Sequence, residues 1–450
     1  MERGINHMGR THEPFAIQLP GRKLYIITDP KDVTEVFNNK HGLDNDYSLR
    51  ELVGVFGVTP EGIRRAWHVP QPGDWCFIPE NPINPQQMSF AKWIQYSYRK
   101  YLLTAETMEE ICSMFVNSLL DTICTDSMES CRRQDNTVSL YTLIRKVMVE
   151  ASTRSMFGPH LHEIDHNVVE YILGFNDNAW QVVTRYPDLF GRSAVSRPRK
   201  KMMAIIRQFV ERPLAENSLA NSFVRNLLIA MENTGLDMHS RAAMLLMVFW
   251  ATVSNEYNAT FWFMAHLLHD VPLLKHVKKE TEAAWQSGEL DVKNISDRYP
   301  VFDAVLNEVL RHKNSAGAMR LVVEKTKIGN KVLQPGNTVL IPFQQIHTNE
   351  NVWGDNCLEF DHTRFLERKS MARNTSFRPF GGGSSYCAGK TLAKQEVFSA
   401  VAILLHRFDL RLAMTGKMNQ PFPVLNVRTP SMGINGPEKG MDLIVEMTER

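Results

Sequence analysis

A single cysteine near the carboxyl end of the chain follows a glycine-rich stretch and offers the clearest chemistry. The stretch runs from Gly381 to Ser385, and Cys387 stands immediately before an expected helix. Glycine allows backbone angles that other residues avoid, so several N–H groups can point at one sulfur, and a helix N-terminus adds positive charge. The pattern favours a thiolate that can ligate a metal. The alternative is that Cys387 is a small buried apolar residue beside an ordinary loop.

Two charged residues three positions apart form a second candidate. Glu308 and Arg311 share one face of an expected helix, and Arg364 can join them from a later loop. A buried arrangement would hold that loop, and removing one partner would leave the other charge uncompensated. A solvated surface pair that contributes little to stability is the alternative.

A polar interruption follows the longest apolar run, which extends over Ala242–Val253 and is too short to span a membrane. Glu256 can act as a general acid beside a dry pocket, or it can point to solvent. Ala251, Asn255 and Ala259 follow one another at a spacing of four residues. This spacing predicts a stripe of small side chains and one amide on one helix face, beside a flat ligand. A structural bulge in a broken helix explains Asn255 equally well.

The elements at the amino-terminal end are predicted to be a hairpin and a helix. Two apolar segments, residues 14–19 and 24–28, flank a Pro-Gly turn and predict a two-stranded ribbon. Asp29 is expected to cap a helix with Pro30 at its first position. The apolar face of that helix carries Val33, Val36 and Phe37.

The rest of the chain is predicted to be mostly helical. Residues 40–86 contain several prolines and no sustained period, which predicts a long irregular connection. The longest helix is expected over residues 240–269, capped by Ser240. Alternating apolar segments between residues 321 and 341 predict a small antiparallel sheet. Residues 350–386 are expected to be irregular, and a last helix begins near residue 388. The fold class is therefore mainly α with a small β domain.

Composition excludes several classes of protein. Lys and Arg total 51 against 49 Asp and Glu, and this net charge of +2 offers no basic field for nucleic acid. Six scattered cysteines do not form a disulfide framework, which indicates a reduced, intracellular protein. The first twenty residues contain neither a signal peptide nor a membrane span.

The ten residues from Phe380 to Gly389, with Gly383 and Cys387 between them, resemble the haem-binding loop of the cytochrome P-450 family. Glu308–Arg311 resembles the helical E-x-x-R of that family, with Arg364 at the arginine position of its meander segment. The resemblance covers essentially the whole chain. It implies the cytochrome P-450 fold as a single domain over residues 1–450, with no N-terminal membrane anchor present in this sequence.

The resemblance also implies a cofactor, haem b, whose iron is axially ligated by the Cys387 thiolate, with Phe380, Gly383 and Gly389 in the binding loop. Arg320 matches a position from which a basic residue often reaches a haem propionate. Arg99 matches a second such position, although it follows Trp93 by six residues where the family often has four. The loop departs from many members at Ser385, where they carry a basic residue.

A further departure concerns oxygen activation. Asn255 and Glu256 occupy the place of the acid and the alcohol that usually relay protons in this family. The flanking residues resemble the branch that contains cholesterol 7α-hydroxylase, sterol 12α-hydroxylase and prostacyclin synthase, where asparagine also replaces the acid. Glu256 would then relay protons itself. Prostacyclin synthase isomerises a peroxide without external electrons, so the resemblance leaves both reaction types open.

The resemblance favours a monooxygenase that oxidises a large apolar substrate, such as a steroid, terpenoid or other polycyclic compound, in a fungal pathway to a secondary metabolite. Electrons would come from NADPH through an NADPH-cytochrome reductase. The alternatives are a haem-thiolate isomerase of a lipid peroxide and a non-catalytic haem or lipid-binding protein. The expected location is the endoplasmic reticulum surface, with peripheral membrane contact, or the cytoplasm if no anchor is missing.

Overall fold

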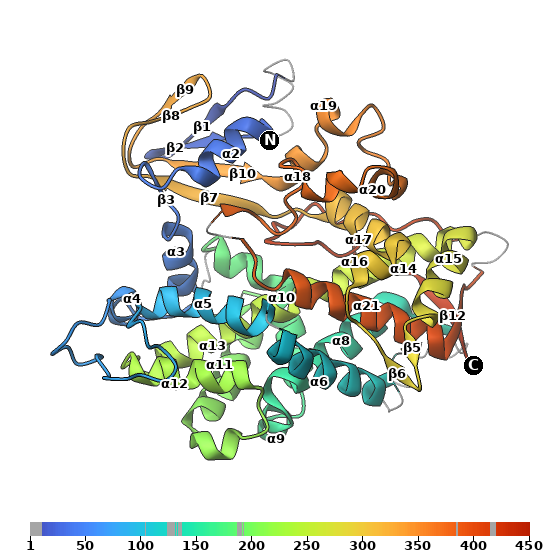
Figure 1. Cartoon of the computed structure of the whole chain (residues 1–450), viewed down its shortest axis with the longest axis horizontal. Coiled ribbons are helices and arrows are strands. Elements are labelled where there is room, and N and C mark those ends of the chain that lie inside the picture. Colours follow the sequence, from blue (N-terminus) through green and yellow to red (C-terminus); the bar gives the residue numbers. More distant parts are fainter. Residues whose placement is uncertain are drawn as a thin grey trace. The chain divides into compact units, whose positions relative to one another are not determined.

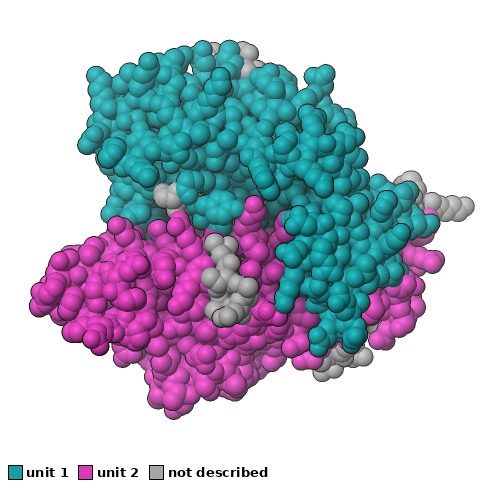
Figure 2. Space-filling model, viewed as in Figure 1, with its two compact units in different colours: residues 1–50, 261–387, 422–441 teal, residues 51–260, 388–421, 442–450 magenta. Residues whose placement is uncertain are grey.

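The computed structural model describes residues 11–103, 105–123, 131, 133, 137–186, 191, 193–383, 386–414 and 420–450. It divides the chain into two compact units, coloured separately in Figure 2. Unit 1 comprises residues 1–50, 261–387 and 422–441, and unit 2 comprises residues 51–260, 388–421 and 442–450. The single domain expected over residues 1–450 stays a prediction. Among the described residues, no helix has both the length and the apolar character needed to cross a membrane.

A five-stranded sheet organises unit 1 (Figure 1). Its order is β1 (Phe15–Leu19), β2 (Arg22–Ile26), β10 (Thr338–Pro342), β7 (Gly317–Val322) and β3 (Leu43–Asp44). The predicted hairpin is confirmed, since β1 and β2 pair antiparallel. The predicted antiparallel sheet is partly wrong, because β10 pairs parallel with β2, while β8 (Thr326–Ile328) and β9 (Lys331–Leu333) form a separate hairpin. Sequence periodicity shows which segments are extended but not which strands pair.

The first helix, α2 (Pro30–Asn38), forms as its sequence predicts. The Asp29 side chain accepts hydrogen bonds from the backbone N–H groups of Lys31 and Asp32 at 2.8 and 3.3 Å. These are two of the donors that a helix start leaves unsatisfied. The predicted apolar face packs into the core beside the sheet and consists of Val33, Val36 and Phe37.

Short helices surround one longer helix in the remainder of unit 1. The longer helix is α17 (Pro300–Lys313), and it contacts both α18 (Phe343–His347) and α20 (Thr363–Glu367). The other elements are α15 (Val271–Glu282), β5 (Trp285–Gln286), β6 (Glu289–Leu290), α16 (Ile295–Arg298), α19 (Glu350–Trp353) and η3 (Lys369–Arg373). The predicted irregular segment over residues 350–386 therefore contains short helical turns.

Unit 2 is mostly helical and has one small sheet of β11 (Phe408–Leu412), β12 (Ile444–Glu449) and β4 (Thr137–Ser139). Its helices are α4 (Pro60–Trp67), α5 (Phe90–Leu103), α6 (Ala105–Ile123), α8 (Leu140–Phe157), α9 (His160–Ile164), α10 (Val168–Val183), α11 (Ser196–Glu211), η2 (Leu214–Asn217), α12 (Ser222–Asn233), α13 (Met238–Val253) and α21 (Lys390–Arg407). A boundary between the units falls within each of two further helices, α3 (Tyr47–Phe56) and α14 (Glu256–His269).

The prediction of an irregular connection over residues 40–86 is wrong for its first half, which contains α3 and α4. Pro60 occupies the first turn of α4, and the Thr59 hydroxyl accepts a hydrogen bond from the N–H of Gly62 at 3.0 Å. Proline is favourable at this position because its missing N–H would have no helical partner there. This proline therefore starts a helix.

The prediction of one helix over residues 240–269 is also wrong. The first of the two helices, α13, is capped by Asp237 and not by Ser240, and it ends at Val253. At the break, the Asn255 N–H donates to the Glu256 carboxylate at 3.2 Å, and the Asn255 amide donates to the Ser254 hydroxyl at 2.9 Å. These local side-chain bonds compete with the helical hydrogen-bond ladder and explain the interruption.

Candidate functional site

The predicted pair Glu308–Arg311 lies at the centre of unit 1, and both side chains are 0% exposed. Two N–H groups of Arg311 donate to the two carboxylate oxygens of Glu308, each at 2.7 Å. The other three donate to the backbone carbonyls of His347, Cys357 and Glu359 at 2.7, 2.6 and 2.9 Å. All five donors of this guanidinium therefore have acceptors. The surface-pair alternative is wrong.

Arg364 joins the pair, as the sequence predicts. Its Nε lies 3.6 Å from Oε1 of Glu308, and its terminal nitrogens donate to the carbonyls of Trp353 and Asn356, each at 2.6 Å. Glu308 also accepts from the N–H of Asp361 at 2.9 Å. Glu308, Arg311 and Arg364 together thus fix several turns of an otherwise irregular segment, because each of their bonds to its backbone replaces one that water would make.

His347 extends this network to the loop that leads to Cys387. Its carbonyl accepts from Arg311, and its Nε2 lies 3.0 Å from the N–H of Arg378. Burial, with a further contribution from the charge of Arg311, lowers the pKa of His347 to about 3. The ring is therefore neutral, and Nε2 acts as the acceptor.

The glycine-rich loop packs closely against α2. The N–H of Cys387 donates to the Phe380 carbonyl at 2.9 Å, which closes the turn. Gly383 has a positive φ of +59°, and a Cβ there would lie 2.8 Å from the backbone oxygen of Phe37. A side chain at Gly383 would therefore strain the loop for two reasons. Cys387 is exposed, and the departure at Ser385 falls outside the described residues.

Arg320 lies on β7 and is only 2% exposed. Burial lowers the pKa of Arg320 to about 10, while the charge of Asp44 acts in the opposite direction. Its guanidinium carbon lies 5.3 Å from the ring centroid of Phe37, the residue that packs against Gly383. A desolvated cation beside this loop fits an anionic group such as a haem propionate.

Two other predicted positions belong to unit 2. Arg99 is exposed on α5, and its assignment to a propionate stays a prediction. Trp93 on the same helix is buried, and its indole N–H donates to the Ile83 carbonyl at 2.7 Å. Gly389 immediately precedes α21, and its carbonyl accepts from the N–H of Ala393 at 2.8 Å.

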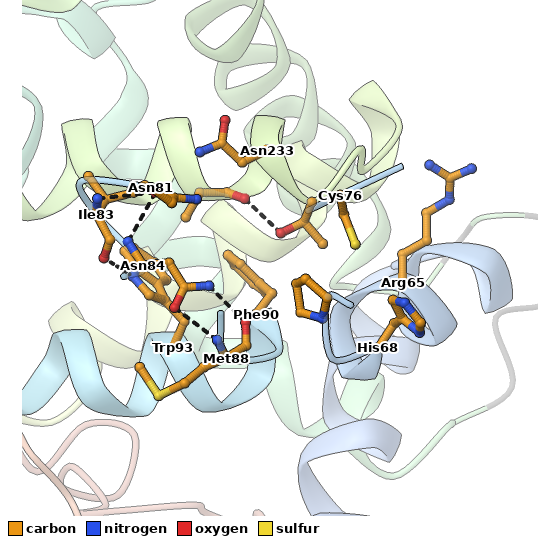
Figure 3. Close-up of a pocket in the computed structure, with 13 residues that line it drawn as sticks. Arg65, His68, Cys76, Asn81, Ile83, Asn84, Met88, Phe90, Trp93 and Asn233 are labelled. Carbon is orange, nitrogen blue, oxygen red and sulfur yellow. Dashed lines mark hydrogen bonds between the residues drawn. The ribbon is translucent and has the colours of Figure 1, made fainter. Parts of the chain in front are cut away.

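Figure 3 shows a small pocket in unit 2 that Trp93 helps to line. Its lining includes the polar side chains of Asn81, Asn84 and Asn233. Asn84 uses its side-chain amide to fix Met88 through bonds of 2.8 and 3.0 Å. These groups hold the segment in place.

The break between α13 and α14 gives Glu256 an unusual environment. Its carboxylate accepts the Asn255 N–H at the start of α14. Burial raises the pKa of Glu256 to about 7, and the backbone hydrogen bonds of Glu256 and Asn255 oppose this effect only in part. Ala259 continues the helical spacing from Asn255, since its N–H donates to the Asn255 carbonyl at 3.0 Å, whereas Ala251 lies before the break.

A second acid with a raised pKa, Glu396, belongs to the same unit and was not predicted. It lies on α21 and is 2% exposed. Burial first, and then the charge of Glu256, raise the pKa of Glu396 well above its usual value. The two carboxyl groups therefore resist ionising together. One signal was available, because Glu396 directly precedes the apolar face of Val397 and Val401 on the last helix.

The buried pair predicts a large effect on stability. Glu308→Ala leaves the Arg311 charge uncompensated, so we expect the free energy of unfolding to fall by about 3–5 kcal/mol, with reduced haem content. Urea unfolding measures this loss. The matched control is Glu211→Ala, which breaks an exposed pair with Arg207 and should cost less than about 1 kcal/mol. Equal losses in the two variants would show that burial adds nothing.

The raised pKa values of Glu256 and Glu396 predict a pH dependence of stability. A carboxyl with a raised folded-state pKa binds its proton more tightly in the folded protein, so stability falls as pH rises above the usual 4.5 toward the raised values. Glu396→Gln should flatten this decline in unfolding free energy, measured by urea titrations between about pH 5 and 8. Exposed Glu232→Gln is the control, and the same slope in both variants would contradict the coupling.

Comparison with known proteins agrees with this arrangement. The family model for cytochrome P-450 matches residues 96–434. A cytochrome P-450 monooxygenase of Gibberella zeae is 22% identical over 89% of this chain and 75% of its own length. The monooxygenase nodJ of Hypoxylon pulicicidum is 23% identical over 97% and 83%, and cytochrome P-450 7A1 of Sus scrofa is 25% identical over 68% and 65%. With its mainly α fold and buried E-x-x-R pair, this chain belongs to the cytochrome P-450 family and is an oxidoreductase of the monooxygenase type.

Proposed function

We propose that Cys387 ligates the iron of haem b in this monooxygenase. The observation that carries the proposal is the connection of its loop to the buried pair. Arg311 holds the carbonyl of His347, and the ring of His347 accepts the N–H of Arg378, two residues before Phe380. The Phe380 carbonyl then accepts the N–H of Cys387. A thiolate needs such a fixed backbone if it is to remain an axial ligand.

The residues around the loop suit distinct roles. Haem, when bound, supplies the activation of oxygen with electrons from a redox partner. Phe380 and Gly383 shape the loop, with Gly389 at the start of the following helix. Arg320 binds one propionate, since it is a buried cation next to Phe37. Arg99 remains a second candidate for such a contact.

Glu256 is proposed to deliver protons, with Asn255 fixing the start of α14. A carboxyl with a pKa near neutrality both gives and takes a proton at physiological pH. The charge of Glu256 helps to raise the pKa of Glu396, so the two carboxyl groups resist ionising together and one proton tends to stay with the pair. The assignment of Glu256 to this role also rests on its place in the family's oxygen-activating segment.

We propose a large apolar substrate, of the steroid, terpenoid or polycyclic class. The name of one relative supports this class, the steroid 17-alpha-hydroxylase/17,20 lyase of Equus caballus. Electrons are proposed to come from NADPH through an NADPH-cytochrome reductase. The similarity to fungal monooxygenases supports a role in a fungal pathway to a secondary metabolite. The single domain over residues 1–450 and a peripheral contact with the endoplasmic reticulum membrane belong to the same proposal.

Ligation by Cys387 predicts the outcome of one substitution. Cys387→Ser should abolish the thiolate signature in the spectrum of the reduced carbon monoxide complex, because a serine hydroxyl is too weakly acidic to supply the anionic donor. Cys76→Ser, at a buried cysteine of unit 2, is the control and should leave the spectrum unchanged. A thiolate spectrum that survives in Cys387→Ser would contradict the assignment.

Proton delivery by Glu256 predicts uncoupling. Glu256→Gln keeps the shape of the side chain but cannot shuttle a proton, so product formation should fall by about 10²-fold while hydrogen peroxide release rises. Product, NADPH consumption and hydrogen peroxide are measured with a reductase present, and Glu232→Gln is the control. Turnover of a lipid peroxide without any reductase, unaffected by Glu256→Gln, would instead identify an isomerase.

A further inference from the structure

Two arginines of unit 1 lie over the same aromatic ring beside the glycine-rich loop. The guanidinium carbons of Arg378 and Arg320 are 4.9 and 5.3 Å from the ring centroid of Phe37. Gly382 and Gly383 complete the cluster, because a Cβ on Gly382 would lie 2.5 Å from an Arg378 nitrogen and 3.2 Å from the Phe37 ring. The cluster therefore combines two cations with the backbone that leads to Cys387.

Arg378 has few partners within the part of the chain that the structure describes. Its side chain donates there to one acceptor, the hydroxyl of Thr34, at 3.2 Å. Its Nε is buried without an acceptor, and no described carboxylate forms an ion pair with it. Burial lowers the pKa of Arg378. The buried Nε has therefore lost water without gaining the hydrogen bond that usually compensates for the loss.

The buried pair in the same unit shows what a compensated arginine looks like. Arg311 directs every N–H group at an acceptor and has Glu308 as its counter-ion. Arg378 differs in both respects, although its backbone is held firmly through His347. Two cations beside one ring also repel each other. An anion bound between them would offset this repulsion and would accept hydrogen bonds from both guanidinium groups.

We propose that Arg378 and Arg320 together bind a haem propionate, with Arg378 supplying the positive charge that the loop lacks at Ser385. The inference rests on the proposed binding of haem at Cys387. A carboxylate matches the forked donors of a guanidinium, and the cluster touches the loop through Gly382. Thr34 and Phe37 then act as positioning residues, which hold the plane of the Arg378 guanidinium.

The test measures how fast the holoenzyme loses haem to an excess of apomyoglobin. Arg378→Gln removes the charge and should accelerate loss by about tenfold, as expected when one charge-assisted hydrogen bond is lost. Arg378→Lys keeps the charge without the forked donors, so its rate of haem loss should lie between those of the wild type and Arg378→Gln. Arg373→Gln, at an exposed arginine five residues earlier, is the matched control and should lose haem at the wild-type rate.

A second arm separates binding of the propionate from simple packing. Adding Ser385→Arg to Arg378→Gln should restore slow haem loss, because many members of the family carry a basic residue at that position of the loop, whereas a packing defect at Phe37 would persist. The reduction potential should fall in Arg378→Gln and recover in the double variant. Haem loss from Arg378→Gln at the rate of Arg373→Gln, or no recovery on adding Ser385→Arg, would overturn the proposal. The carbon monoxide spectrum distinguishes the two failures, since an intact thiolate signature leaves haem ligation by Cys387 standing.

Discussion

The ion pair between Glu308 and Arg311 is the constraint on which the rest of unit 1 depends. Removing two charges from water is expensive, and attraction between them compensates only when geometry is good and the remaining donors and acceptors are satisfied. Here the five donors of Arg311 meet a carboxylate and three carbonyls, and Glu308 accepts from the N–H of Asp361 as well. Satisfying one guanidinium thus determines the path of a long segment that has little regular structure, and the segment in turn carries the cysteine loop.

Buried charge elsewhere in the chain is less well compensated, and that difference separates structural from functional candidates. Glu308 is in contact with the opposite charge of Arg311, whereas desolvation raises the pKa of both Glu256 and Glu396 and the charge of Glu256 raises that of Glu396 further. Arg378 has one neutral acceptor. Burying an uncompensated charge can cost several kcal/mol of folding free energy. A bound ligand that compensates the charge, or a proton that the group gives and takes, explains why such groups are present.

The sequence was informative where one local interaction decides the structure. The Asp29 cap, the Pro-Gly hairpin and the spacing of Glu308 and Arg311 each depend on neighbours within a few residues, and all three predictions are confirmed. It was misleading at residues 240–269, because apolar periodicity continues through a break that Asn255 and Glu256 make with their own side chains. The place of Glu396 beside an apolar helix face was a signal that it is buried, but its coupling to Glu256 and the contacts of Arg378 with Thr34 and Phe37 join residues that are distant in the sequence.

The two departures from the family pattern have the same physical form. At Ser385 the loop lacks a cation, and at Asn255 the helix lacks an acid, yet a cation and an acid occur in the respective units, Arg378 beside Gly382 and Glu256 beside Asn255. An anion requires positive charge within a few ångströms but not from a particular direction, because the Coulomb term depends on distance while bonding geometry can be met by more than one side chain. A proton relay likewise requires a group of suitable pKa and not a particular residue. A motif position can therefore change while the physical requirement persists, and the residue that meets it is found by asking which buried charge has no other reason to be there.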